Sequence, residues 1–83
     1  MRGVPTFLLS HHHTPAECGR TYAAWRGFAS PLRHSEALST CPLGGHGLWW
    51  FVEAPDQASA LRQLPEYLSH QTEVIRVSRV PIP

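Results

Sequence analysis

Imidazole and thiol side chains are the groups through which this chain could perform chemistry. Its 83 residues include six histidines, at positions 11–13, 34, 46 and 70, and two cysteines, Cys18 and Cys41. Neutral imidazole and thiolate are preferred ligands of Zn²⁺, Cu and Ni²⁺. Imidazole also acts as a general acid or base near neutral pH. The pattern therefore favours a transition-metal site or acid–base catalysis.

The spacing of these residues matches no established metal motif, because the chain has no C-x₂-C pair and no helical H-x₃₋₅-H pair. On a strand, however, His11 and His13 would point to the same side, about 6.5–7 Å apart along the chain. Two imidazoles at that spacing can bind one ion from one face. Which other side chains could join these two imidazoles at a metal ion depends on the strands and helices around them.

Local signals predict six elements in the order β-α-β-β-α-β. Strands are expected over residues 5–13, 38–43, 47–53 and 72–82, and helices from Thr14 to Gly27 and from Pro55 to His70. Pro42 places the second strand at an edge, and Pro65 is expected to kink or restart the second helix. The third strand is apolar on both faces, which predicts a central, covered strand.

The first helix has a strong start signal. Thr14 is a candidate N-cap, Pro15 takes the first helical position, and Glu17 completes a capping box. Cys18, Tyr22 and Trp25 then form one apolar stripe, so Cys18 is either a buried small side chain or a reactive thiol at a helix N-terminus.

This element order predicts an α+β fold of the ferredoxin-like type over residues 1–83 as one domain. The sheet order would be 4-1-3-2, antiparallel, with both helices on one face. The bare face would expose part of the third strand, where Trp49 and Trp50 point to opposite sides. We expect one Trp in the core and the other at a dimer interface or a pocket wall.

The predicted β-α-β-β-α-β order within about 80 residues resembles the dimeric α/β-barrel superfamily. The resemblance includes a helical Ala-Leu-x-x-Leu-Pro-x-Tyr stretch, here Ala60–Tyr67, and a terminal Val-x-x-Val-x-Ile strand. The members nearest in size are the small domains similar to muconolactone isomerases and to a nickel-binding bacterial protein. The resemblance implies the fold and a homodimer. It carries over no site residues, because no catalytic motif of those enzymes is matched.

The predicted topology brings seven of the eight His and Cys side chains to one edge of the sheet, with only His34 at the far end. The proposed ligand set is His11, His13, Cys41 and His46, binding Zn, Ni or Cu. Glu17 is predicted to accept a hydrogen bond from the free N–H of a metal-bound imidazole. A one-residue shift in strand register would substitute His12 for His11 and His13. The alternative is a solvated strand end without a ligand.

Composition and charge exclude several classes of function. The net charge is +1 with no basic cluster, which argues against a nucleic-acid partner. No apolar run reaches the roughly 20 residues of a membrane span, and Val4–Leu9 is too short for a signal peptide. We therefore expect a cytoplasmic protein with no membrane partner and with reduced thiols.

Three functions remain open at this point. The first is a small homodimeric metal-binding protein. The second is a cofactor-free isomerase, cyclase or oxygenase that takes a small hydrophobic substrate in the barrel cleft and uses a His as general acid or base. The third is an interaction domain without chemistry.

Overall fold

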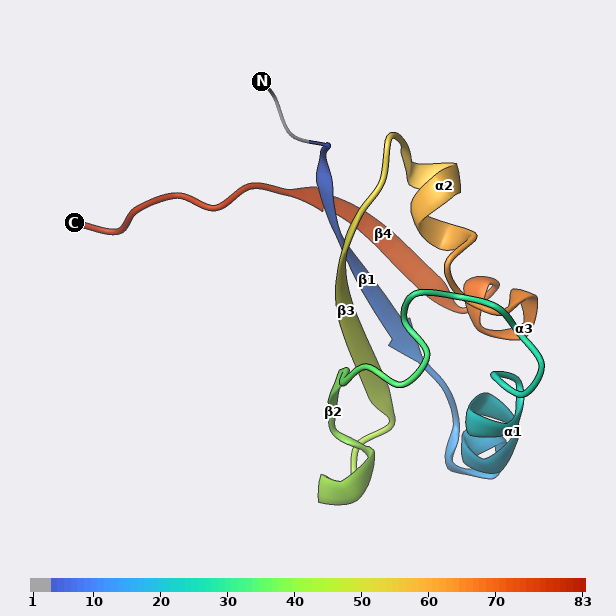
Figure 1. Cartoon of the computed structure of the whole chain (residues 1–83). Coiled ribbons are helices and arrows are strands. Elements are labelled where there is room, and N and C mark those ends of the chain that lie inside the picture. Colours follow the sequence, from blue (N-terminus) through green and yellow to red (C-terminus); the bar gives the residue numbers. More distant parts are fainter. Residues whose placement is uncertain (1–3) are drawn as a thin grey trace.

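The computed structural model describes residues 4–83, so the first three residues of the predicted 1–83 domain lie outside the described part. It is an α+β fold with a four-stranded antiparallel sheet (Figure 1). The elements are β1 (Thr6–His12), the 3₁₀ helix η1 (Pro15–Glu17), α1 (Cys18–Ala23), β2 (Leu38–Ser39), the 3₁₀ helix η2 (Cys41–Leu43), β3 (Gly47–Glu53), α2 (Gln57–Leu61), α3 (Glu66–Ser69) and β4 (Thr72–Val77).

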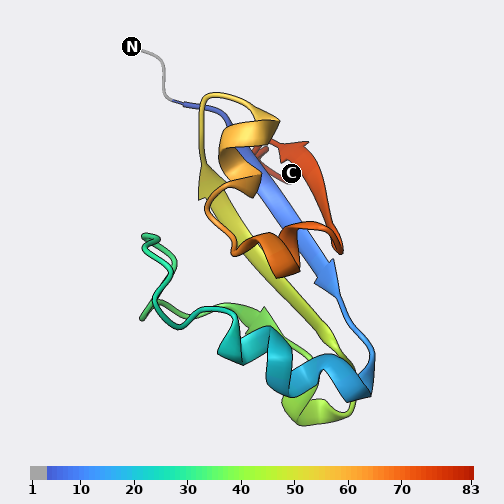
Figure 2. The ribbon, with the colours of Figure 1, turned by 90° about the vertical axis from the view of Figure 1, so that its right-hand side faces the viewer.

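The sheet order β2-β3-β1-β4 is the predicted 4-1-3-2 order. The helices lie on one face of the sheet (Figure 2). The ferredoxin-like fold class is therefore confirmed. Strand register places the end of β1 beside the start of β3, because His12 pairs with Gly47 and His11 with Leu48. This end of the sheet carries the candidate site.

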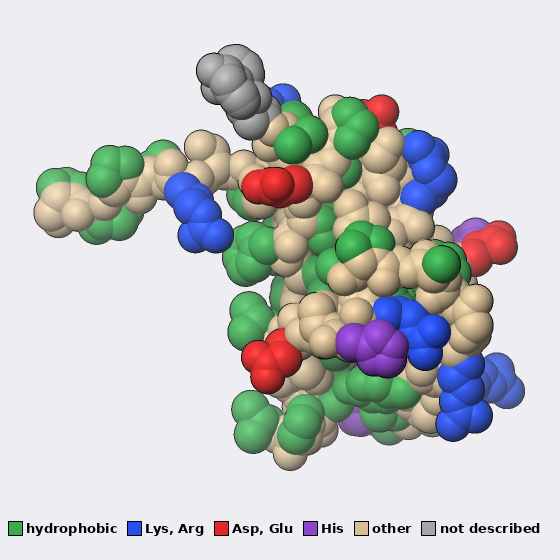
Figure 3. Space-filling view, viewed as in Figure 1, with side chains coloured by type: hydrophobic (Ala, Val, Ile, Leu, Met, Phe, Trp, Pro, Cys, Tyr) green, Lys and Arg blue, Asp and Glu red, His purple; other side chains and the backbone are tan. Residues whose placement is uncertain are grey.

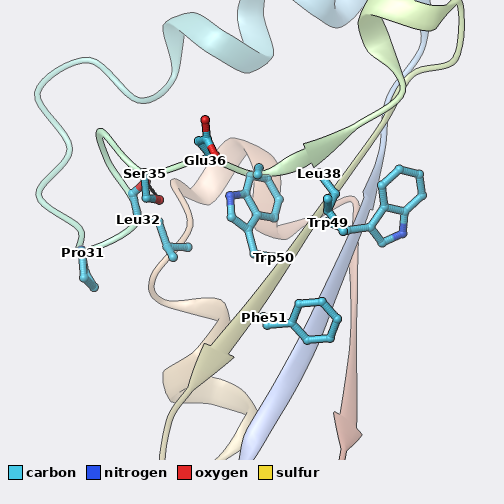
Figure 4. A pocket seen from close by; sticks show the side chains of 9 residues that line it. Pro31, Leu32, Ser35, Glu36, Leu38, Trp49, Trp50 and Phe51 are labelled. Carbon is cyan, nitrogen blue, oxygen red and sulfur yellow. Dashed lines mark hydrogen bonds between the residues drawn. The ribbon is translucent and has the colours of Figure 1, made fainter.

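The core lies between the sheet and the helices, because alternate strand residues point to the helical face. Leu9, which is fully buried, pairs with Trp50 of β3 and with Val74 of β4. The buried apolar residues are Phe7, Leu9, Leu48, Trp50, Val52, Ala54, Ala60, Leu64 and Leu68. Trp49 and Trp50 point to opposite sides of β3, as predicted (Figure 4). Trp50 is the core residue of the pair.

The prediction that β3 is a central strand is confirmed, and the face predicted to be bare is open in the single chain. This is the face away from the helices, and the Phe51 side chain on it is 56% exposed. Trp49 on that face is half-buried, folds over Gly47 and meets the His12 ring edge-on, with ring centroids 5.6 Å apart.

The first helix is shorter than predicted. α1 ends at Ala23, and the chain continues in tight turns to Gly27, whose φ of +75° ends the helical conformation. The predicted apolar stripe is only partly present. Trp25 packs on Trp50, with ring centroids 5.9 Å apart, whereas Tyr22 is 48% exposed and the buried residue of α1 is Thr21.

β2 and β4 also end earlier than predicted, and the second helix is divided in two. β2 stops at Ser39, and the last part of the predicted strand over 38–43 forms η2 instead, because Pro42 cannot donate to a strand ladder. β4 stops at Val77, which pairs with Thr6, the first residue of β1. Pro65 divides the second helix into α2 and α3, a restart that the sequence predicted. Asp56 caps α2 by accepting from the Ser59 N–H at 2.7 Å.

Within residues 4–83, none of the helices is long and apolar enough to cross a membrane.

Candidate metal centre

Two histidines and two cysteines converge at the end of the sheet where β1 ends and β3 begins. One ligand atom from each of His13, Cys18, Cys41 and His46 lies within 4.8 Å of the other three. His13 follows β1, Cys18 opens α1, Cys41 opens η2, and His46 precedes β3. Four separate segments therefore deliver two imidazoles and two thiols to one small volume.

Backbone hydrogen bonds hold the two histidine-bearing segments together. The His13 N–H donates to the His46 carbonyl at 3.0 Å and so extends the β1–β3 ladder by one residue. Across the hairpin, the Thr40 N–H donates to the Gly47 carbonyl at 3.0 Å, and the Gly47 N–H donates to Thr40 Oγ1 at 3.1 Å. Gly45 permits this packing, because a Cβ there would lie 2.5 Å from Thr40 Oγ1. The hairpin thus places Cys41 beside the histidines.

Glu17 anchors the segment that presents Cys18. Its carboxylate accepts from the Thr14 N–H at 2.9 Å, from Gln71 Nε2 at 3.2 Å and from the Tyr67 hydroxyl at 3.3 Å. The Thr14 and Gln71 hydrogen bonds lower the pKa of Glu17 to about 2. Among residues 4–83 it accepts from no imidazole, so the prediction that it would bind an imidazole N–H was wrong. It ties the start of α1 to the end of α3 instead.

A chain of hydrogen bonds runs from α3 to His13. The Thr72 hydroxyl donates its proton to the Leu68 carbonyl at 2.7 Å, so Thr72 Oγ1 accepts from His11 Nδ1, 3.2 Å away. In a neutral imidazole the other nitrogen then has a free lone pair. His11 Nε2 therefore accepts from His13 Nδ1 at 3.2 Å.

The consequence of this chain is a defined tautomer for His13. With its proton on Nδ1, its Nε2 carries the lone pair, and this nitrogen lies 3.6 Å from Cys41 Sγ. Burial, followed by the charge of a neighbouring histidine, lowers the pKa of both His11 and His13, which favours the neutral form that the chain requires. A metal-binding imidazole needs this arrangement, in which one nitrogen donates its N–H to a partner and the other offers its lone pair to the ion.

The two thiols are not equivalent. Burial alone would raise the pKa of Cys41, but hydrogen bonds from Ser39, Tyr22 and Cys18 to its sulfur outweigh it, and the pKa is lowered. Burial, and then the interaction with Cys41, raises the pKa of Cys18. Cys41 is therefore the better thiolate of the two.

His46 contributes an unsatisfied atom to the group. Its Nδ1 is buried and has no hydrogen-bond partner among residues 4–83. A buried polar atom without a partner is destabilising unless another ligand satisfies it. One metal bond at this nitrogen would do so.

Of the four sequence-predicted ligands, His13, Cys41 and His46 lie in the group, and His11 lies behind His13. Cys18 takes the fourth place. The sequence left Cys18 either a buried side chain of the apolar stripe or a reactive thiol, and omitted it from the ligand set. Its predicted place at this edge, in the first turn of the helix, is the signal that could have identified it as a ligand. Of the other side chains expected at this edge, His12 is exposed on the open face, and His70 is exposed and 3.5 Å from Glu66.

Comparisons with protein-family models, with curated proteins and with solved structures find no match to this chain.

Proposed function

We propose that this protein binds one transition-metal ion, zinc in the first instance, through His13, Cys18, Cys41 and His46. The observation that carries the proposal is the mutual approach of their four ligand atoms to within 4.8 Å. Two thiolates and two imidazoles are a tetrahedral zinc donor set, and the same donors also bind copper and nickel. In such a site neighbouring ligand atoms are separated by roughly 3.3–3.8 Å, so small side-chain rotations would complete it.

The number of protein ligands favours holding the ion over catalysis. Four ligands fill the tetrahedral coordination and leave no position for substrate or water. The ion would also stabilise the fold. Thr21 is the only buried residue of α1, and η2 has none, so packing alone attaches these segments weakly to the sheet. A metal bound by Cys18 and Cys41 would link both of them to β1 and β3.

The first test is elemental analysis of untagged protein after size-exclusion chromatography. We expect about one zinc ion per chain, and after cobalt exchange the absorption bands of tetrahedral thiolate coordination. Removal of the metal with a chelator should lower the melting temperature, because the binding free energy is also folding free energy. Metal-free protein whose melting temperature does not change on adding zinc would contradict the proposal.

The hydrogen-bond chain gives a prediction for a residue outside the ligand set. Replacing the fully buried His11 by Phe keeps a ring of similar size but removes the acceptor for His13 Nδ1. We expect zinc affinity to fall by about 10–100-fold while binding remains one to one, the usual cost of losing an outer-shell partner. A competition titration measures this, with circular dichroism reporting the fold.

The matched control is His12→Phe, the same change at the adjacent, exposed position, which should leave the affinity unchanged. Equal losses in both variants would show that His11 does not act through His13. Loss of stoichiometric binding in His11→Phe alone would instead assign His11 to the ligand set.

The homodimer implied by the superfamily resemblance remains part of the proposal. Its support is the open face of the sheet, where Leu38, Phe51 and Ile75 are 63%, 56% and 45% exposed. Hydrophobic side chains line the side of the molecule away from the helices (Figure 3). Apolar area of this kind marks an interaction surface. Sedimentation velocity should give a dimer, and Phe51→Arg a monomer.

A second candidate function, binding or conversion of a small hydrophobic molecule, is supported by a pocket of about 350 Å³ beside Tyr22, Trp25 and Trp50. It adjoins a groove of about 750 Å³ whose lining is drawn in Figure 4. His34 also lines the pocket of about 350 Å³, and its imidazole would be the general acid or base. Quenching of tryptophan fluorescence by small aromatic compounds tests binding. If the protein converts one of these compounds, loss of that conversion in His34→Gln would favour an enzyme.

A further inference from the structure

The two thiols of the candidate metal centre are close enough to react with each other. Cys18 opens α1 and Cys41 opens η2, 23 positions later in the sequence, yet their Sγ atoms lie within 4.8 Å. A disulfide needs an S–S separation of about 2.05 Å. Rotation of the side chains and a small shift of η2, which contains no buried residue, would bring the sulfurs together.

Both thiols are also accessible to a small oxidant. Each cysteine is partly exposed and free, whereas the histidine behind the site, His11, is fully buried. Partial exposure together with a nearby second thiol is the setting in which a thiol is oxidised reversibly to a disulfide.

We propose that Cys18 and Cys41 form an intrachain disulfide when a hydroperoxide oxidises them, and that this disulfide and the bound metal exclude each other. One thiolate attacks the peroxide, its S–O bond forms as the O–O bond breaks, and the departing oxygen takes a proton to become an alcohol or water. The second thiol attacks the resulting sulfenic sulfur, the S–S bond forms and water leaves. In sum, two thiols and one hydroperoxide give one disulfide, one alcohol and one water.

The exclusion of metal follows from the donor set and rests on the proposed function. A disulfide sulfur is no longer a thiolate and does not bind the ion, so oxidation would leave only His13 and His46 as ligands. The disulfide would replace the metal as the link between α1 and η2, so the oxidised chain should keep its fold. Reduction would restore the site.

The experiment treats reduced, metal-free protein with one equivalent of hydrogen peroxide under anaerobic conditions. We expect intact mass to fall by two hydrogen atoms, both free thiols to disappear, and peptide mapping to join the Cys18 and Cys41 peptides. Zinc-loaded protein treated in the same way should release its zinc to a chromogenic chelator, and dithiothreitol should restore binding.

Two variants serve as controls. Cys18→Ser retains one thiol, so it should gain oxygen in place of forming an intrachain crosslink. His46→Ala keeps both thiols and should form the disulfide as the unmodified chain does. Disulfides only between chains, or a gain of oxygen by one thiol without an intrachain crosslink, would overturn the inference.

The readouts separate this inference from the metal proposal. A chain that forms the Cys18–Cys41 disulfide but never binds zinc would leave the thiol pair intact as a redox site and remove the metal function. A chain that binds zinc stoichiometrically and forms no such disulfide would support the metal function and overturn the redox inference. A disulfide that forms while zinc stays bound would overturn the mutual exclusion.

Discussion

Replacing Cys41 by Ser is expected to lower zinc affinity by about 10²–10³-fold. Structural zinc sites supply about 10–16 kcal/mol in all, so one of four ligands accounts for roughly 2.5–4 kcal/mol, and each 1.4 kcal/mol is tenfold in affinity. Cys18→Ser should cost a similar amount, because its sulfur lies in the same 4.8 Å group. Competition with a chromophoric chelator measures both losses.

This series also decides between two ligand sets. The sequence-predicted set includes His11 and omits Cys18, whereas the geometry places Cys18 in the group and His11 behind His13. His70→Ala is the control, because that imidazole is exposed and outside the group. Full affinity in Cys18→Ser, with loss of binding in an otherwise folded His11→Ala variant, would restore the set predicted from the sequence.

The second large effect is on stability. Trp50→Ala should destabilise the protein by about 3–5 kcal/mol, the usual cost of removing a buried aromatic ring. Trp50 is 7% exposed, packs on Trp25 and pairs with Leu9 in the middle of the core. Because small domains have only about 5–15 kcal/mol of stability in total, this loss would remove a large share of it. Urea unfolding of the zinc-loaded protein measures the difference.

Trp49→Ala makes the same change at the adjacent position and should cost about 1 kcal/mol or less in the monomer, because Trp49 is half-buried on the open face. The comparison cancels effects of the substitution on the unfolded chain. A larger cost for Trp49 than for Trp50 would contradict the assignment of the two faces. A cost for Trp49 that rises with protein concentration would instead indicate that a second chain covers that face.

The sequence alone determined the order of elements and the end of the sheet at which the chemistry gathers. The capping and turn signals between the apolar segments carry this information, because they set the order of the strands and helices. Antiparallel pairing of neighbouring strands then puts His13 beside His46, and the hairpin that joins β2 to β3 brings Cys41 to them. These are consequences of the connection rules, whereas the sequence left the register open by one residue, which would substitute His12 for His11 and His13.

Only the tertiary structure decided which side chains meet. Pattern separates faces, but it does not resolve the few ångströms that distinguish a ligand from the residue behind it. His11 and His13 share a face and a strand, yet Thr72 binds His11 from β4, and His11 in turn orients His13. Cys18 leaves the predicted core stripe because η1 precedes α1 and Glu17 is bound by Tyr67 and Gln71 at the end of α3. The contacts of Thr72 with His11, and of Tyr67 and Gln71 with Glu17, join residues 50 to 61 positions apart, and local sequence carries no record of their distances or angles.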